Sequence, residues 1–221
     1  MTEHRRPADI ERTSMEIITR ELEARGISLE AEQAPVVRRV IHATADFDFA
    51  GTLRFTPGAV AAGAAALRKG APIVTDTNMA RAGISRPGLA RLGGEVHCFM
   101  AEPAIAAAAK RNGTTRAVAA VEYAAERFPG AVLAVGNAPT ALLRAAELIE
   151  AGLRPPLVIG VPVGFVNVAE SKERILAVCE EYGVPAIVAM GRKGGSTVAA
   201  AICNALIYTA AGLLDPEKRD G

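Results

Sequence analysis

The chain has 221 residues, half of them hydrophobic, and its 25 basic and 24 acidic side chains nearly cancel. This size fits one α/β domain with a core large enough to need neither disulfides nor structural metal. The balanced charge argues against a nucleic-acid-binding surface, which would need a basic excess. We expect a single domain over residues 1–221, with mobile ends at 1–12 and 214–221.

The cysteines and the ends of the chain favour a cytoplasmic protein. Cys98, Cys179 and Cys203 are too far apart for a CxxC motif and odd in number for a disulfide framework. The first dozen residues are charged throughout, unlike a secretory signal. The stretch 196–214 lacks charge and is long enough to span a bilayer, but its alanine and polar residues favour a helix packed against a sheet. We therefore predict no membrane partner.

Two helices are predicted near the N-terminus. Thr13 and Glu16 have the spacing of a capping box, which predicts a helix from Thr13 to about Gly26 with Ser14 in its first turn, next to Met15. A second helix, from near residue 32, contains His42. An alanine-rich helix at 59–69 follows.

From residue 72 onward, short apolar runs alternate with helical segments. The expected strands are 72–75, 95–99, 131–135, 157–161 and 186–190, and the expected helices are 102–111, 116–128, 139–151, 170–182 and 197–211. Near-continuous apolar strands that alternate with helices predict a parallel sheet covered on both faces. The predicted fold class is α/β: a three-layer parallel sheet of about five strands with helices on both faces, flavodoxin- or Rossmann-like.

His42 is one of three histidines and stands among apolar neighbours near a helix end. If the helix continued, Arg38 and Asp46 would lie four residues to either side on its face. A carboxylate would raise the pKa of an imidazole and arginines would lower it, so the direction stays open. His42 is either a proton donor or a histidine satisfied by structural hydrogen bonds.

Ligands of parallel sheets bind beyond the carboxyl ends of the strands, where helix N-termini present free amides. The loop after the fifth strand combines glycines with Arg192 and Lys193, and Ser196 can cap the next helix, which predicts an anion site. The alternative is that its glycines only shape a turn. Neither a Walker A nor a GxGxxG motif is present. Candidates on the four loops are Asp76, Thr77, Met79, Asn137, Thr140, Gly164, Phe165, Val166, Arg192, Lys193, Gly194, Gly195, Ser196 and Thr197.

Three further side chains have competing interpretations. Arg116 follows a capping Thr115, where its charge gains nothing from the helix dipole, so it is either a carboxylate ligand or a solvated surface residue. His97 and Cys98 would face opposite sides of one strand and cannot bind one metal, so both are assigned to the core. No metal or cofactor site is predicted.

Five blocks of sequence resemble one known family. The string RVIHATADFDF at 39–49 is followed, in the family's order, by VTDTNMARAGI, GNAPTAL, VIGVPVGFVNVAESK and GRKGGSTVAAAICNAL. The chain thereby resembles the precorrin-8X methylmutase family, also called precorrin isomerase, of cobalamin biosynthesis. The resemblance extends from Ser14 to about Leu213.

The resemblance implies an isomerase that moves a methyl group from C-11 to C-12 of the precorrin ring to give hydrogenobyrinic acid, without a cofactor. It implies a homodimer with its site near the subunit interface, and a tetrapyrrole substrate that is either metal-free or cobalt-containing. His42 would donate a proton to the ring. Besides the loop candidates, Ser14, Met15, Thr44 and Arg116 would contact the substrate.

Two alternatives come from other functional classes. A tetrapyrrole-binding carrier would use His42 only to hold the ring and would leave the absorption spectrum of precorrin-8X unchanged. A flavodoxin-like nucleotide or phosphate binder would use the glycine loops and would form a tight nucleotide complex.

Overall fold

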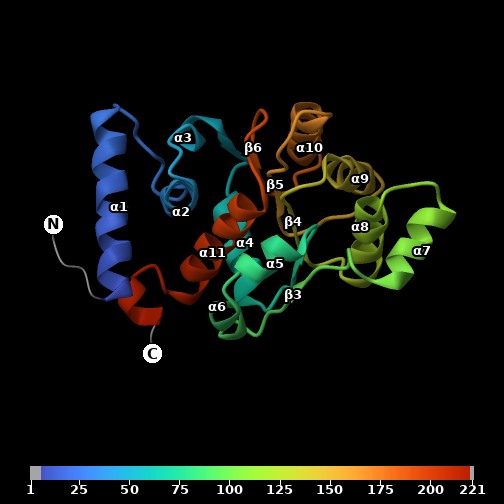
Figure 1. Cartoon of the computed structure of the whole chain (residues 1–221), viewed down its shortest axis with the longest axis horizontal. Helices are drawn as coiled ribbons and strands as arrows, with labels where there is room; N and C mark the ends of the chain where they lie inside the picture. Colours follow the sequence, from blue (N-terminus) through green and yellow to red (C-terminus); the bar gives the residue numbers. More distant parts are fainter. Residues whose placement is uncertain (1–5, 220–221) are drawn as a thin grey trace.

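The structure, a computed structural model, describes residues 6–219 and contains a six-stranded sheet between two groups of helices (Figure 1). The strands are β1 (Leu53–Phe55), β2 (Ile73–Thr75), β3 (Val96–His97), β4 (Val132–Val135), β5 (Val158–Gly160) and β6 (Ala186–Ala189). Their order is β1-β6-β5-β4-β2-β3, and all pairs except β1–β6 are parallel. The mixed α/β class with helices on both faces is confirmed.

The expectation of a purely parallel sheet is wrong at one edge. β1 pairs antiparallel with β6, with Leu53 opposite Ala189 and Phe55 opposite Ile187. The buried hydroxyl of Thr56 extends this pairing by accepting a hydrogen bond from the Ala186 amide at 2.8 Å. A strand of three residues is too short to show a period in the sequence, so β1 could not be predicted.

One face of the sheet is covered by α7 (Pro103–Arg111), α8 (Arg116–Arg127), α9 (Pro139–Glu150) and α10 (Val168–Glu181). Their alanine-rich apolar sides form one core with the strands, which includes Val135, Leu142 and Ile175. These helices agree with the predicted ones to within a few residues.

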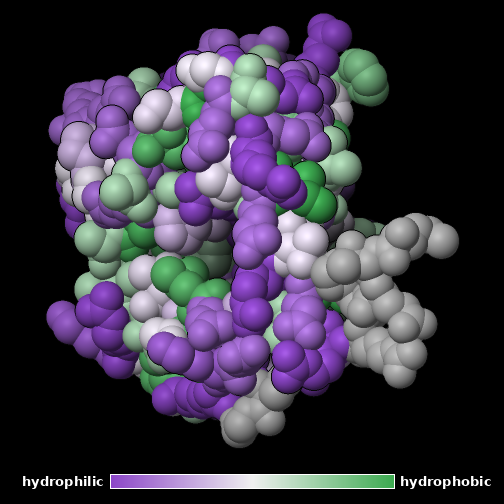
Figure 2. Space-filling view, turned by 90° about the vertical axis from the view of Figure 1, so that its left-hand side faces the viewer, coloured by the Kyte–Doolittle hydropathy of each residue, from purple (hydrophilic) through white to green (hydrophobic). Residues whose placement is uncertain are grey.

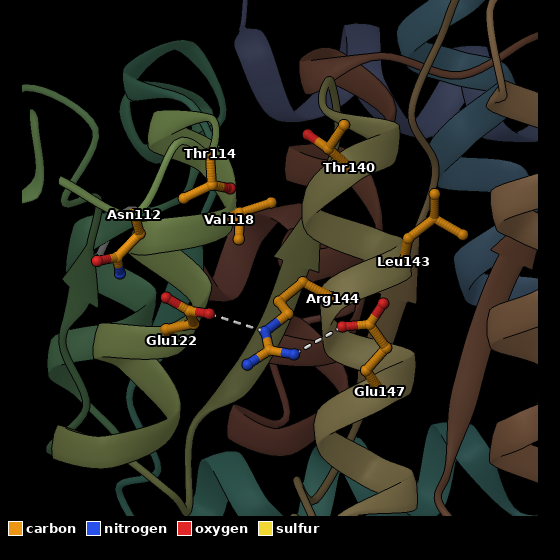
Figure 3. A pocket seen from close by; sticks show the side chains of 8 residues that line it. All are labelled: Asn112, Thr114, Val118, Glu122, Thr140, Leu143, Arg144 and Glu147. Atoms are coloured by element: carbon orange, nitrogen blue, oxygen red, sulfur yellow. Dashed lines mark hydrogen bonds and ion pairs between the residues drawn. The ribbon is translucent and has the colours of Figure 1, made fainter. Parts of the chain in front are cut away.

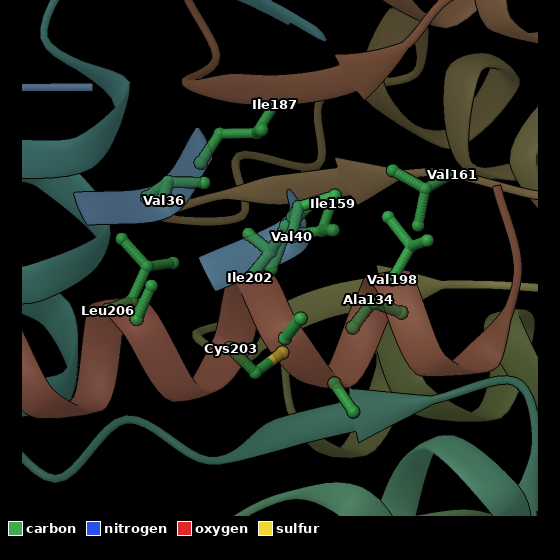
Figure 4. Close-up of a cluster of buried hydrophobic side chains, with 14 of the residues drawn as sticks. Val36, Val40, Ala134, Ile159, Val161, Ile187, Val198, Ile202, Cys203 and Leu206 are labelled. Carbon is green, nitrogen blue, oxygen red and sulfur yellow. The ribbon is translucent and has the colours of Figure 1, made fainter. Parts of the chain in front are cut away.

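The other face is built around α11 (Ser196–Ala211). Its neighbours are α2 (Ala34–Thr44), α4 (Ala59–Arg68), α5 (Asn78–Gly83) and α6 (Arg86–Ala90). Figure 4 shows Ile202 of α11, Val40 of α2 and Ile159 of the sheet in one buried cluster. The charge-free stretch is thus a buried helix, as predicted. Among residues 6–219, none of the helices combines the length and apolarity needed to cross a bilayer.

The N-terminal helix differs from its prediction. α1 (Pro7–Ala24) begins before Thr13, with proline in its first turn and no side-chain cap, so the capping-box assignment is wrong and Ser14 lies inside the helix. The early start is stabilised from outside, because Glu11 accepts hydrogen bonds from Arg39 at 2.5 Å and from Arg219 at 2.7 Å.

The contact between Glu11 and Arg219 joins the two ends of the chain, which were expected to be mobile. Residues 7–12 are helical, and Arg219 belongs to a 3₁₀ helix (Pro216–Arg219) that lies against α1. The rest of the expected ends, residues 1–5 and 220–221, lies outside the described residues. A short helix α3 (Phe49–Thr52) joins α2 to β1.

Asp76 holds the centre of the sheet edge, between β2 and β4. Its carboxylate accepts hydrogen bonds from the amides of Gly136 at 2.8 Å, Asn137 at 2.8 Å and Ala138 at 2.7 Å. Burial raises the pKa of the Asp76 carboxyl, and the three amide donors limit the rise. Asp76, a candidate for ligand binding in the sequence, therefore caps the loop between β4 and α9 (Pro139–Glu150) within this chain.

Replacing Asp76 with alanine is expected to lower the free energy of unfolding by about 3 kcal/mol, because three buried amides would lose their acceptor. Urea denaturation followed by circular dichroism measures this. Glu181→Ala removes an exposed carboxylate that accepts no hydrogen bond from residues 6–219, and it should change stability by less than about 0.5 kcal/mol. Equal effects of the two substitutions would contradict the capping role.

Candidate active site

His42 lies in the last turn of α2, beside Ser14 of α1. The Ser14 Oγ and the His42 Nδ1 are 2.8 Å apart, within hydrogen-bond distance. When the hydroxyl donates this bond, the ring proton resides on Nε2. No described residue makes a hydrogen bond with Nε2, so this nitrogen is available to a ligand.

An apolar cavity of about 430 Å³ adjoins this pair. It lies along α1, on which Ile10 and Ile17 are exposed. Figure 2 looks onto this end of the molecule and shows hydrophobic surface in a hollow between hydrophilic residues. Its lining consists of Ile10, Thr13, Ser14, Ile17, Ile18, Glu21, Ile41, His42, Ala45 and Phe47. An apolar ligand edge placed here would meet the imidazole.

The surroundings of His42 lower its pKa. Removal of water by neighbouring side chains is the main cause, and the positive charge of Arg39 is the second, while Glu11 opposes both. The structure thereby settles a direction that the sequence left open. A lowered pKa makes His42 neutral at pH 7 and a stronger acid once it is protonated.

Asp46 does not share the face of His42. The helix ends at Thr44, and Ala45 adopts the left-handed conformation with φ 53°, which turns the chain away. Asp46 and Asp48 instead bind the Lys193 ammonium at 2.7 and 2.6 Å. This contact joins the end of α2 to the glycine loop, residues 191–195. Thr44 donates its hydroxyl to the Val40 carbonyl within α2.

The glycine loop is tightly bound to its neighbours. Thr77 and Ser196 share a hydrogen bond of 2.8 Å between their hydroxyls, and Thr77 caps α5. The Gly195 amide donates to the Val161 carbonyl at 2.8 Å. A Cβ on Gly194 would collide with that same carbonyl, so close approach of two backbones requires glycine here. Thr197 is exposed at the start of α11.

Apolar side chains project from the same edge of the sheet. Met79, Phe165 and Val166 are 70%, 82% and 77% exposed, which is unusual for large hydrophobic residues. The guanidinium of Arg192 lies 5.4 Å from the centre of the Phe165 ring. Gly164 precedes this tip with φ 141°, a conformation that side chains other than glycine rarely adopt.

The residues predicted on α8 and α9 lie apart from His42. A groove of about 460 Å³ between these helices is lined by Asn112, Thr114, Val118, Glu122, Thr140, Leu143, Arg144 and Glu147 (Figure 3). Thr140 contacts Thr115 at 3.2 Å, and Arg116 is exposed nearby. None of the groove residues lines the His42 cavity. Within one chain, Arg116, Asn137 and Thr140 are therefore not joined with His42.

Glu11 is a residue that the sequence reasoning missed. It was assigned to a polar lead, yet it pairs with Arg39 and Arg219, and both guanidinium groups lie over the Tyr208 ring, at 5.2 and 3.9 Å. Because Arg39 and Arg219 are distant from Glu11 in the sequence, no local pattern could have predicted these ion pairs. Met15, next to Ser14, is partly buried against the core and does not line the His42 cavity.

Fold and site together define an α/β protein whose polar loops follow parallel strands and whose histidine borders an apolar cavity. Residues 9–209 match the family model described as precorrin-8X methylmutase. The cobalt-precorrin-8 methylmutase of Salmonella typhimurium is 47% identical over 78% of this chain and 80% of its own. The precorrin-8X methylmutase of Pseudomonas aeruginosa is 43% identical over 89% of this chain and 93% of its own.

A solved structure agrees with these relatives. The crystal structure of precorrin-8X methylmutase from Thermus thermophilus superposes with a TM-score of 0.82 at 45% identity, covering 92% of this chain and 98% of the other. The chain belongs to the precorrin-8X methylmutase family of cobalamin biosynthesis, and its class is that of an isomerase.

The environment of His42 makes a prediction about its titration. By NMR of the ring nitrogens, His42 should titrate below the ordinary value of 6.5. Glu11→Gln should lower its pKa further, because the negative charge of Glu11 stabilises the imidazolium form and the substitution removes it. Glu217→Gln, on the exposed tail, is the matched control and should leave the titration unchanged. A rise in pKa in Glu11→Gln would contradict the electrostatic description.

Proposed function

We propose that this chain moves a methyl group from C-11 to C-12 of precorrin-8X, or of its cobalt form, and that His42 donates a proton to the macrocycle. The observation that carries this proposal is the Ser14–His42 pair beside an apolar cavity, in a chain of the methylmutase family. Similar identity to relatives named for each form, 47% and 43%, supports a tetrapyrrole substrate of either kind. Family membership argues against the carrier and the nucleotide binder.

The reaction rearranges bonds within one molecule, so no group must enter or leave. A proton on a ring nitrogen draws electron density away from the migration terminus, and the methyl group moves toward it. His42 supplies this proton from Nε2 in its imidazolium form, in which Nδ1–H donates to the Ser14 Oγ and fixes the ring, and it becomes a neutral imidazole when the proton has left. Acid catalysis of this kind contributes about a hundredfold or more to the rate. Holding the flat ring against apolar walls contributes the rest.

The substrate's acetate and propionate groups need donors, and the loops supply them. Arg192, the glycine-loop amides and the Thr77–Ser196 pair lie at one sheet edge, with Met79, Phe165 and Val166 as apolar surface. Lys193, already paired with Asp46 and Asp48, contributes chiefly by joining this edge to α2. These residues form the proposed carboxylate-binding side of the pocket.

We further propose a homodimer in which α8 and α9 of one subunit complete the pocket of the other. Support comes from the separation of Arg116 and Thr140 from His42 within one chain, and from the exposed apolar tips beside the sheet edge. Arg116 would then bind a substrate carboxylate across the interface. Three free cysteines agree with the reducing cytoplasm that we infer as its location.

His42→Ala should bind precorrin-8X but convert it at least about a hundredfold more slowly, because the proton donor is lost while the walls remain. The change of the substrate spectrum to that of hydrogenobyrinic acid measures turnover, and equilibrium titration measures binding. His97→Gln, a histidine stacked on Phe128 away from the cavity, is the control and should keep its turnover. Full turnover by His42→Ala would end the proton assignment.

The shared pocket predicts complementation between two inactive variants. A mixed dimer of His42→Ala and Arg116→Ala contains one pocket with both native residues, so random mixing should restore about a quarter of wild-type activity. Subunits are exchanged under mild denaturant and assayed before and after. Each variant exchanged with itself is the control. No recovery from mixed dimers would place Arg116 outside the partner's pocket.

A further inference from the structure

Lys172 of α10 is a fully buried lysine, with 0% of its surface exposed. Lysine is rarely buried without a charged partner, and no carboxylate among residues 6–219 forms an ion pair with it. Its ammonium instead donates hydrogen bonds to the carbonyl oxygens of Gly191 and Lys193, each at 2.8 Å. Burial lowers the pKa of Lys172 to about 8, so the charge persists at neutral pH.

These two hydrogen bonds determine the orientation of two peptide groups in the glycine loop. In a trans peptide the carbonyl and the following amide point in opposite directions. With the carbonyls of Gly191 and Lys193 turned inward to Lys172, the amides of Arg192 and Gly194 point away from the buried lysine. Neither amide has a hydrogen-bond acceptor among the described residues. The Arg192 carbonyl is held separately, by the Gly164 amide at 3.3 Å.

The loop is fixed on its other sides as well. The Gly195 amide is bound to Val161, and Gly194 has no room for a side chain against the loop after β5. The Lys193 side chain reaches the carboxylates of Asp46 and Asp48. Lys172 thus sets the direction of the 191–192 and 193–194 peptide planes, while the Gly164 and Val161 contacts set the two planes that follow them.

We propose that Lys172 is a positioning residue for substrate binding, which turns the amides of Arg192 and Gly194 toward a carboxylate of the tetrapyrrole. This inference rests on the proposed function and adds a residue that does not touch the substrate. Two amides that converge on one anion form the kind of backbone concavity that binds carboxylates and phosphates. The buried ammonium holds the carbonyl oxygens of Gly191 and Lys193 on the opposite side, so they do not repel an anion bound to the two amides.

Replacing Lys172 with methionine keeps the apolar stem and removes the donors. The Kd for hydrogenobyrinic acid and the KM for precorrin-8X should rise about tenfold or more, the size of a lost charge-assisted contact. The kcat at saturation should stay within about threefold of wild type, because His42 and Ser14 are untouched. Lys110→Met, an exposed lysine on α7, is the matched control and should change neither constant.

A second ligand distinguishes the positioning role of Lys172 from a purely structural one. For a product whose carboxylates are amidated, the Lys172→Met penalty should shrink to less than about threefold, since no anion meets the amides. An equal penalty for both ligands, or a loss of kcat with KM unchanged, would overturn the inference. Wild-type protein that bound no tetrapyrrole would overturn the proposed function as well, whereas unimpaired binding by Lys172→Met would overturn this inference alone.

If Lys172→Met fails to fold, Lys172→Ala with added propylammonium replaces it. The small cation restores an ammonium at the same depth, so it should lower the KM of the variant at least about fivefold, while tetramethylammonium, which has no N–H donors, should not. A variant that regained thermal stability with propylammonium but not substrate affinity would also overturn the inference.

Discussion

The burial of α11 is the constraint on which the rest of the structure depends. From Val198 to Ile207 its side chains are almost all buried, against the sheet on one side and α2, α4, α5 and α6 on the others. Each large side chain buried in this way contributes about 2 kcal/mol to stability. One helix thereby fixes two parts of the proposed site. Its first residue, Ser196, meets Thr77 at the sheet edge, and its flank holds α2, which carries His42 in its last turn.

Three charged side chains shape the site without lying in its cavity. Asp76 collects the amides after β4, Glu11 gathers two arginines that hold α1 near His42, and Lys172 collects carbonyls of the glycine loop. Each of the three forms hydrogen bonds with polar groups that would otherwise be buried without a partner. Leaving those groups unpaired would lower stability by more than burying the charged side chain does. The proposed chemistry therefore depends on backbone that these residues hold in place, and His42 is the only titratable group required to move a proton.

Much of the fold could be predicted because buried parallel strands and their helices leave long apolar runs. β1 could not, because it has three residues and owes its place to pairing with β6. At Thr13 a good local capping signal was overruled by distant contacts of Glu11, which lengthen α1. Asp46 was misplaced because the turn at Ala45 is not marked by glycine.

The sequence names candidate residues for the site but not their arrangement in space. His42 and the loop residues carry the family's motifs, yet the Ser14–His42 contact joins positions 28 residues apart. Lys172 stands among charged neighbours in the sequence, Glu170 and Glu173, a pattern typical of a solvated helix surface. Burial of a long polar side chain depends on the tertiary packing of α10, and no local pattern encodes it.

A crystal structure with bound hydrogenobyrinic acid tests the central claim most directly. The account predicts a ring nitrogen within about 3 Å of His42 Nε2 and a substrate carboxylate on the amides of Arg192 and Gly194. A macrocycle bound with its nitrogens turned away from His42, in both subunits of the assembly, would contradict it.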